Sequence, residues 1–171
     1  KIINWGILGT GAMAKRFAQD LQLLPDARLV AVGSRSQEKA SAFAQPFNVT
    51  YRHGSYQELA ENPAVDAVYI ATPHSCHHAN ALLCLASGKA VLCEKPFAIN
   101  APQAAEIIKL ARKKRLLIME AMWTRFLPSM TRLRKLLADK AMGDVRMLAA
   151  DFGTKADPEK SGRLFDPALG G

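Results

Sequence analysis

The stretch I-I-N-W-G-I-L-G-T-G-A-M-A, residues 2–14, runs from an apolar strand into a glycine-rich turn. Gly9, Gly11 and Ala14 make the pattern G-x-G-x-x-A, and apolar residues at helical spacing follow it. A second apolar run about twenty residues later completes a βαβ unit of the kind that holds a dinucleotide phosphate at a helix N-terminus. Gly9 permits the tight turn, and Gly11 leaves room for a pyrophosphate to reach the backbone. The alternative is a purely structural strand-to-helix turn.

The same alternation of apolar strands and amphipathic helices continues to residue 121. Continuous apolar runs predict strands over residues 28–33, 49–51, 64–72, 90–93 and 116–119. Ser55 with Glu58 forms a capping box, and Asn100 with Gln103 also indicates a helix start. Strands that are apolar throughout are typical of a parallel sheet covered on both faces. We therefore expect an α/β fold with a doubly wound parallel sheet over residues 1–121.

Beyond residue 121 the pattern changes, and we expect residues 122–171 to begin a second, incomplete α+β domain. A helix is predicted over residues 128–140 and a strand over residues 145–153. One helix and one strand cannot bury a core of their own, and a single strand edge invites pairing.

Composition indicates an ordinary globular protein. The 171 residues are 49% hydrophobic, and no apolar run approaches the ~20 residues of a membrane span. No secretory signal is visible, and three cysteines without C-x-x-C spacing suggest reduced thiols, so we expect a cytoplasmic protein. The net charge of +8 and the basic run at residues 112–115 raise nucleic acid as a partner. We do not expect nucleic acid, because that run ends a helix and carries no interleaved aromatic residues.

The end of the second strand bears on the choice between NAD and NADP. An acidic residue there would bind a ribose 2′-hydroxyl and repel a 2′-phosphate. This chain has Ser34 and Arg35 instead, which favours NADP over NAD. Ser34 with Gln37 also fits a helix cap, and both roles can coexist.

Two further groups of polar residues follow strands at the edge where parallel sheets bind ligands. The segment from Ala71 through His74, with His77 after it, predicts a loop that lines the cofactor. Its H-x-x-H-H spacing also fits a metal cluster, but no Cys, Asp or Glu joins it at ligand spacing, so we expect no metal. Lys95 follows Glu94 after the next strand and could hydrogen-bond a substrate oxygen; the alternative is a solvated turn lysine.

These motifs resemble the glucose-fructose oxidoreductase and inositol dehydrogenase family. The matching segments are G-T-G-A-M-A at residues 9–14, A-T-P-H-S-C-H at residues 71–77 and C-E-K-P at residues 93–96. The segments E-A-M-W-T-R-F, residues 120–126, and D-F-G, residues 151–153, are most similar to the branch of dimeric dihydrodiol dehydrogenases and NADP-dependent D-xylose dehydrogenases. The resemblance covers the whole chain. It implies an N-terminal Rossmann domain and a substrate domain, in an enzyme about twice this length.

The resemblance also implies functional roles. Lys95 would be the catalytic lysine, and Ser34 and Arg35 would face the adenosine 2′-phosphate. Trp123, Arg125 and Phe152 would contribute to the substrate pocket, and the family's Gly-Gly, here Gly170 and Gly171, leads into a helix that completes proton transfer. The family usually has Asn where this chain has His74, although the dihydrodiol branch tolerates His. The expected cofactor contacts are Gly9, Thr10, Gly11, Ala12, Met13, Ser34, Arg35, Ala71, Thr72, His74, His77, Glu94 and Lys95.

The expected function is therefore NADP-dependent hydride transfer to or from a hydroxyl-bearing carbon of a sugar, polyol or trans-dihydrodiol. We expect a small-molecule substrate, no membrane partner, and a homodimer or higher homo-oligomer at full length. The alternative is a non-catalytic NADP-binding redox sensor or regulatory module.

Overall fold

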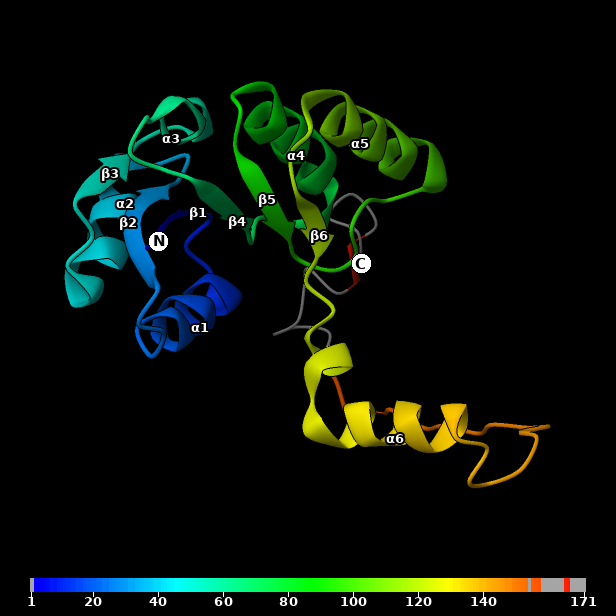
Figure 1. Ribbon diagram of the computed structural model, residues 1–171. Helices are drawn as coiled ribbons and strands as arrows, with labels where there is room; N and C mark the ends of the chain where they lie inside the picture. Colours follow the sequence, from blue (N-terminus) through cyan, green and yellow to red (C-terminus); the bar gives the residue numbers. More distant parts are fainter. Residues whose placement is uncertain (1, 154, 158–164, 167–171) are drawn as a thin grey trace.

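One parallel sheet organises the computed structural model, which describes residues 2–153, 155–157 and 165–166 (Figure 1). Its strand order is β3-β2-β1-β4-β5-β6, and every neighbouring pair runs parallel. The strands are β1 (Ile3–Leu8), β2 (Ala27–Gly33), β3 (Tyr51–His53), β4 (Ala67–Ile70), β5 (Ala90–Cys93) and β6 (Ile118–Glu120). The chain runs outward from β1 in one direction and from β4 in the other. This confirms the predicted α/β fold and places a crevice where the strand order reverses.

Helices cover both faces of the sheet because alternate strand residues point to opposite sides. On one face lie α1 (Ala12–Leu21) and α2 (Gln37–Ala44); on the other lie α3 (Tyr56–Glu61), α4 (His77–Ala86) and α5 (Ala101–Lys114). Ile7 packs with Ala14 and Ala18 of α1. Its neighbour Leu8 instead shares a core with Leu59 of α3 and Leu85 of α4.

Side-chain caps mark the starts of α2, α3 and α5. As predicted, Ser55 Oγ accepts a hydrogen bond from Glu58 N (3.2 Å), and Asn100 Oδ1 accepts one from Gln103 N (3.0 Å). The alternative role of Ser34, as the cap of the second helix, is wrong. Ser36, still extended at φ −137°, is the N-cap of α2 and accepts from Lys39 N at 3.2 Å.

Two short strands begin two residues later than predicted, at β3 and β6. The reason is clear at β6. Helix α5 ends on Arg115 in the left-handed conformation (φ 56°), and Leu116 N still bonds to Ala111 O. The chain therefore needs two more residues to reach β5, where Ile118 pairs with Val91.

The chain beyond β6 lies apart from the sheet. A short 3₁₀ helix, η3 (Trp123–Phe126), leads into α6 (Pro128–Ala138), which Figure 1 shows standing away from the other helices. No residue in 122–153 is buried. The strand predicted over residues 145–153 is wrong: this segment is irregular, because among the described residues no strand lies beside it to complete its hydrogen bonds. The boundary at residue 121 stays a prediction, and Gly170 and Gly171 lie outside the described residues.

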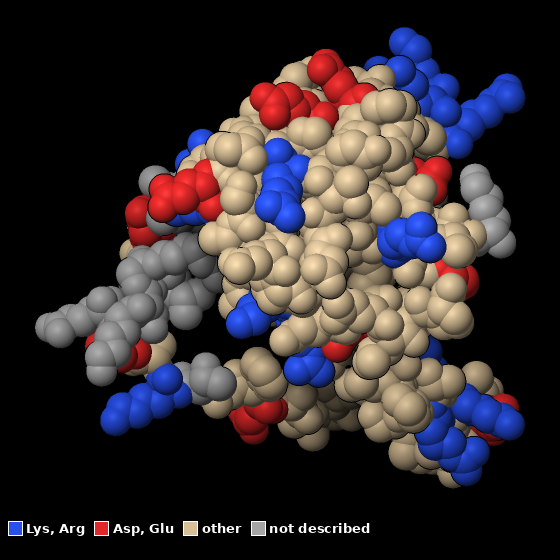
Figure 2. All heavy atoms as spheres, turned by 90° about the vertical axis from the view of Figure 1, so that its left-hand side faces the viewer, with Lys and Arg blue, Asp and Glu red and all other residues tan. Residues whose placement is uncertain are grey.

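The surface shows no single dominant charge on the face seen in Figure 2. There Lys and Arg side chains are interspersed with Asp and Glu. Within the described part of the chain, no helix is both long enough and apolar enough to span a bilayer.

Candidate functional site

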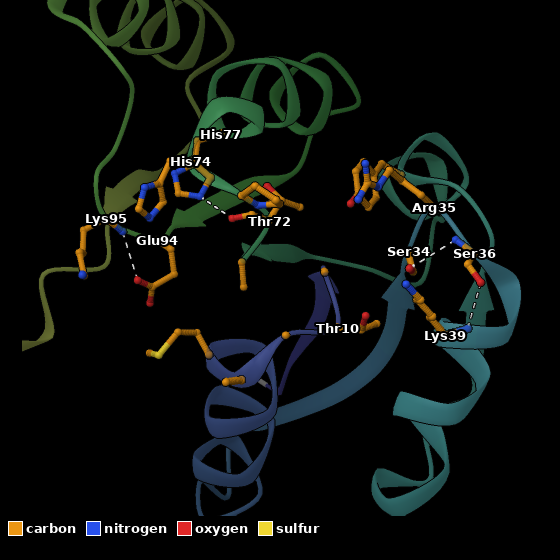
Figure 3. A pocket seen from close by; sticks show the side chains of 17 residues that line it. Thr10, Ser34, Arg35, Ser36, Lys39, Thr72, His74, His77, Glu94 and Lys95 are labelled. Carbon is orange, nitrogen blue, oxygen red and sulfur yellow. Dashed lines mark hydrogen bonds between the residues drawn. The ribbon is translucent and has the colours of Figure 1, made fainter. Parts of the chain in front are cut away.

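A pocket of about 840 Å³ lies where four strands end. It is lined by residues that directly follow β1, β2, β4 and β5, as Figure 3 shows. The structure gathers every expected cofactor contact around this pocket: Gly9, Thr10, Gly11, Ala12, Met13, Ser34, Arg35, Ala71, Thr72, His74, His77, Glu94 and Lys95. Four further residues line the pocket that the sequence motifs did not predict: Ser36, Lys39, Tyr56 and Pro73.

The two glycines of the opening turn have different reasons to be glycine. Gly9 has φ +103°, and a Cβ there would lie 2.7 Å from Ala71 O, so the fold itself requires glycine. Gly11 is the extended N-cap of α1 at φ −81°, and a Cβ there would meet no atom of the described chain within 4 Å. The space beside Gly11 opens onto the pocket at a helix N-terminus, where N–H groups and the helix dipole favour an anion.

Cationic side chains gather at the end of β2. Arg35 and Lys39 are both exposed and line the pocket, and neither forms an ion pair with a carboxylate of the described residues. Ser34 Oγ accepts from Ser36 N at 3.4 Å, which turns the chain into α2. Tyr56 lies close enough to Arg35 for the guanidinium charge to act on it, but burial is the larger effect and raises the Tyr56 pKa. Two cations and a hydroxyl at one edge form a site suited to a phosphate.

The sequence carried a signal for Lys39 but none for Tyr56. Lys39 lies three residues after the Ser36 cap, in the first turn of α2. If Ser36 is taken as the cap, helical spacing predicts that Lys39 lies near Arg35. Tyr56 begins α3, an element separated from Arg35 by a whole strand, and only the packed sheet brings the two together.

His77 is fully buried at the start of α4, and backbone carbonyls face both of its ring nitrogens. Nδ1 lies 2.7 Å from Pro96 O and Nε2 lies 2.9 Å from Thr72 O. A carbonyl oxygen only accepts, so a ring nitrogen is the donor in each of these bonds. Asn80 Nδ2 donates to Thr72 Oγ1 at 3.0 Å. His77 therefore links two loops of the pocket wall, rather than presenting a free nitrogen to it.

Glu94 and Lys95 form the wall after β5. Glu94 is buried, accepts from the Tyr69 hydroxyl at 2.5 Å and accepts from Lys95 N at 3.2 Å. Burial, with the hydrogen bond to Glu94, raises the pKa of Tyr69, so its hydroxyl keeps the proton it donates. Lys95 is exposed at the pocket, and its peptide bond to Pro96 is cis. The Lys95 ammonium is thus available for a hydrogen bond to a ligand oxygen.

The residues expected to line a substrate pocket do not reach this one. Trp123 is 58% exposed, Phe152 is fully exposed, and neither they nor Arg125 line the pocket. Arg125 O instead accepts from Arg134 Nη1 at 2.6 Å, which ties η3 to α6. Their roles in substrate binding stay predictions.

The histidines considered as metal ligands do not converge. His77 bonds two carbonyls, whereas His78 pairs with Glu106 across α4 and α5 at 2.8 Å. Across residues 2–153, 155–157 and 165–166, no three His, Cys, Asp or Glu side chains are grouped to hold a metal ion.

The family comparison agrees with the fold and with a pocket at the carboxyl edge of its parallel sheet. Residues 3–122 match the model of the oxidoreductase family with an NAD-binding Rossmann fold. The chain belongs to this family. The match confirms the resemblance seen in the sequence motifs.

The relatives point to the dihydrodiol dehydrogenase branch. The chain is 44% identical over 153 residues to trans-1,2-dihydrobenzene-1,2-diol dehydrogenase of Sus scrofa, covering 88% of this chain and 46% of that protein. Identity to the Xenopus tropicalis protein of the same name is 43% over 170 residues, covering 98% and 51%. The chain therefore spans about half the length of the curated relatives it matches.

Solved structures give the same fold. KijD10, a 3-ketoreductase from Actinomadura kijaniata in complex with NADP, superposes with a TM-score of 0.79 at 30% identity, covering 85% of this chain and 47% of that one.

Proposed function

We propose that the full-length protein is an NADP-dependent oxidoreductase that acts on a hydroxyl-bearing carbon of a sugar, polyol or trans-dihydrodiol. The observation that carries the proposal is Gly11. Its missing side chain leaves open space at the N-terminus of α1, on the pocket that also contains Lys95. No contact within the described chain requires glycine there, whereas an approaching pyrophosphate does.

The described residues fit the cofactor along the length of the pocket. The α1 N-terminus would hold the pyrophosphate, while Ser34, Arg35 and Lys39 would hold a 2′-phosphate. The absence of an acidic residue directly after β2 supports NADP over NAD. When bound, NADP would supply the redox chemistry of hydride transfer.

The chain's own contribution to the reaction would come from Lys95. Its ammonium would donate a hydrogen bond to the substrate oxygen, hold the carbinol carbon in place and favour the charge that develops on that oxygen. Glu94 is buried beside it and held by Tyr69, so it would present a fixed carboxylate to the cofactor side of the pocket.

Two further properties belong to the proposal. The dihydrodiol and xylose dehydrogenase resemblance supports a homodimer at full length. The three free thiols, two of them buried, support a reducing compartment such as the cytoplasm.

The test is a spectrophotometric screen of the full-length protein with NADP and NAD against xylose, glucose and trans-dihydrodiols. We expect turnover with at least one of them and a preference for NADP. Arg35→Ala and Lys39→Ala should each weaken NADPH binding by about tenfold while changing NADH binding by less than about twofold, because only NADPH carries the 2′-phosphate. No turnover with any substrate, together with tight NADPH binding, would favour the non-catalytic sensor.

A further inference from the structure

The turn that carries Lys95 is held by side chains from other elements. Glu120, the last residue of β6, accepts a hydrogen bond at Oε1 from Phe97 N at 2.9 Å. His77, the first residue of α4, lies with Nδ1 at 2.7 Å from Pro96 O. Both bonds are made to main-chain atoms within two residues of Lys95.

Phe97 and Ala98 pack against the core, but the turn makes few main-chain hydrogen bonds of its own. Pro96 has no N–H to donate, and residues 94–100 belong to neither a strand nor a helix. Among the described residues, Lys95 N bonds only to the adjacent Glu94 side chain, at 3.2 Å, so this bond does not tie the turn to a distant element. A loop without ladder hydrogen bonds is ordinarily among the mobile parts of a fold.

His77 and Glu120 contact the turn from two different elements, α4 and β6. The His77 ring is fully buried and bonds Thr72 O through its other nitrogen, so it joins the loop after β4 to the loop after β5. Figure 3 shows His77 and Thr72 on one wall of the pocket, with Glu94 and Lys95 beside them. Glu120 is half-buried and does not line the pocket, so it acts on the site only through Phe97.

We propose that Glu120 and His77 are positioning residues that hold the 95–97 turn and thereby fix the direction of the Lys95 side chain. The inference rests on the proposed role of Lys95 in catalysis. Because the turn is held from two elements, the Lys95 ammonium is already oriented when the substrate oxygen binds. Displacement of a reacting group by about 1 Å can lower the rate by about a hundredfold. Neither Glu120 nor His77 is required to exchange a proton with the substrate.

The test compares Glu120→Ala with Glu120→Gln in the full-length enzyme. Gln keeps an oxygen that can accept from Phe97 N but removes the charge, whereas Ala removes both. We expect Glu120→Ala to lower kcat by about tenfold or more, with KM and the Kd for NADPH within about threefold of wild type. Glu120→Gln should restore kcat to within about threefold, because position matters and charge does not.

Matched variants separate this role from simple destabilisation. His78→Ala breaks a histidine–carboxylate pair on the same helix as His77 and should leave kcat unchanged. Backbone hydrogen exchange at Phe97 should accelerate in Glu120→Ala but not in Glu120→Gln, a readout that needs no substrate. His77→Ala should give the same loss of kcat, with thermal unfolding used to confirm that it folds.

The outcomes distinguish this inference from the proposed function. If the wild type turns over no substrate, the oxidoreductase proposal fails first. If it is active but Glu120→Ala keeps its kcat while the Phe97 amide loses protection, the turn does not position Lys95. If Glu120→Gln is as slow as Glu120→Ala, the carboxylate charge is what acts, and the positioning role is refuted.

Discussion

The different reasons for Gly9 and Gly11 can be tested by adding one methyl group at each. Gly9→Ala places a Cβ 2.7 Å from Ala71 O and 3.0 Å from Ala71 C, on a residue at φ +103°. Gly11→Ala places a Cβ in open space at φ −81°, which any residue adopts. The first change should damage the fold and the second should damage binding.

The magnitudes follow from the geometry. A positive φ costs a residue with a Cβ about 1–2 kcal/mol. Forcing Ala71 to move adds about 1–3 kcal/mol, so Gly9→Ala should lower the free energy of unfolding by about 2–5 kcal/mol. Gly11→Ala replaces a tolerated N-cap residue by a poor one and should cost about 1 kcal/mol at most. A bound pyrophosphate meeting the new methyl group loses about 1–3 kcal/mol, or roughly 5- to 150-fold in Kd.

Gly88 supplies the matched control. It too has positive φ (+80°), at the end of α4, but a Cβ there would meet no atom of the described residues within 4 Å. Gly88→Ala should therefore show the cost of φ alone, without the clash and without any effect on the pocket.

The assays are urea unfolding followed by circular dichroism and NADPH titration followed by fluorescence. Unchanged NADPH affinity in Gly11→Ala would falsify the pyrophosphate assignment at the α1 N-terminus. A Gly9→Ala cost no larger than that of Gly88→Ala would show that the approach of Ala71 is not what requires glycine.

Three further predictions concern buried polar groups. Burial raises the Cys84 pKa from 9.0 to about 12, so the folded chain keeps a proton that the unfolded chain releases. This contribution to stability should be complete below pH 9 and lost towards pH 12, and iodoacetamide at pH 9 should modify Cys76 well before Cys84 in mass spectra. Tyr69→Phe leaves buried Glu94 without its hydroxyl donor and should lower the urea-unfolding free energy by about 1–3 kcal/mol; an unchanged value would contradict the bond. Lys89→Met removes bonds of 2.7 and 2.8 Å to two carbonyls and should destabilise by about 1–3 kcal/mol for each. Lys89 precedes β5, far from the pocket edge, so NADPH affinity should not change.

Much of the fold was readable because its signals are local. The apolar run before Gly9 and the caps at Ser55 and Asn100 each depend on a few neighbouring residues. The strand predicted over residues 145–153 is absent because a strand requires more than a local signal. The alternation of apolar and polar residues is local, but a strand also needs a neighbouring strand to pair with.

The sequence by itself determined which residues follow each strand. Because parallel strands bring their carboxyl ends to one edge, it also determined that Gly11, Arg35 and Lys95 lie along the same edge of the sheet. Only the tertiary structure decided how those residues are held. Tyr56 reaches Arg35, and Glu120 reaches Phe97 from 23 positions along the chain, because the order of strands in the sheet makes neighbours of distant segments. No local pattern encodes such contacts, since they depend on which strands and helices pack together rather than on how each one forms.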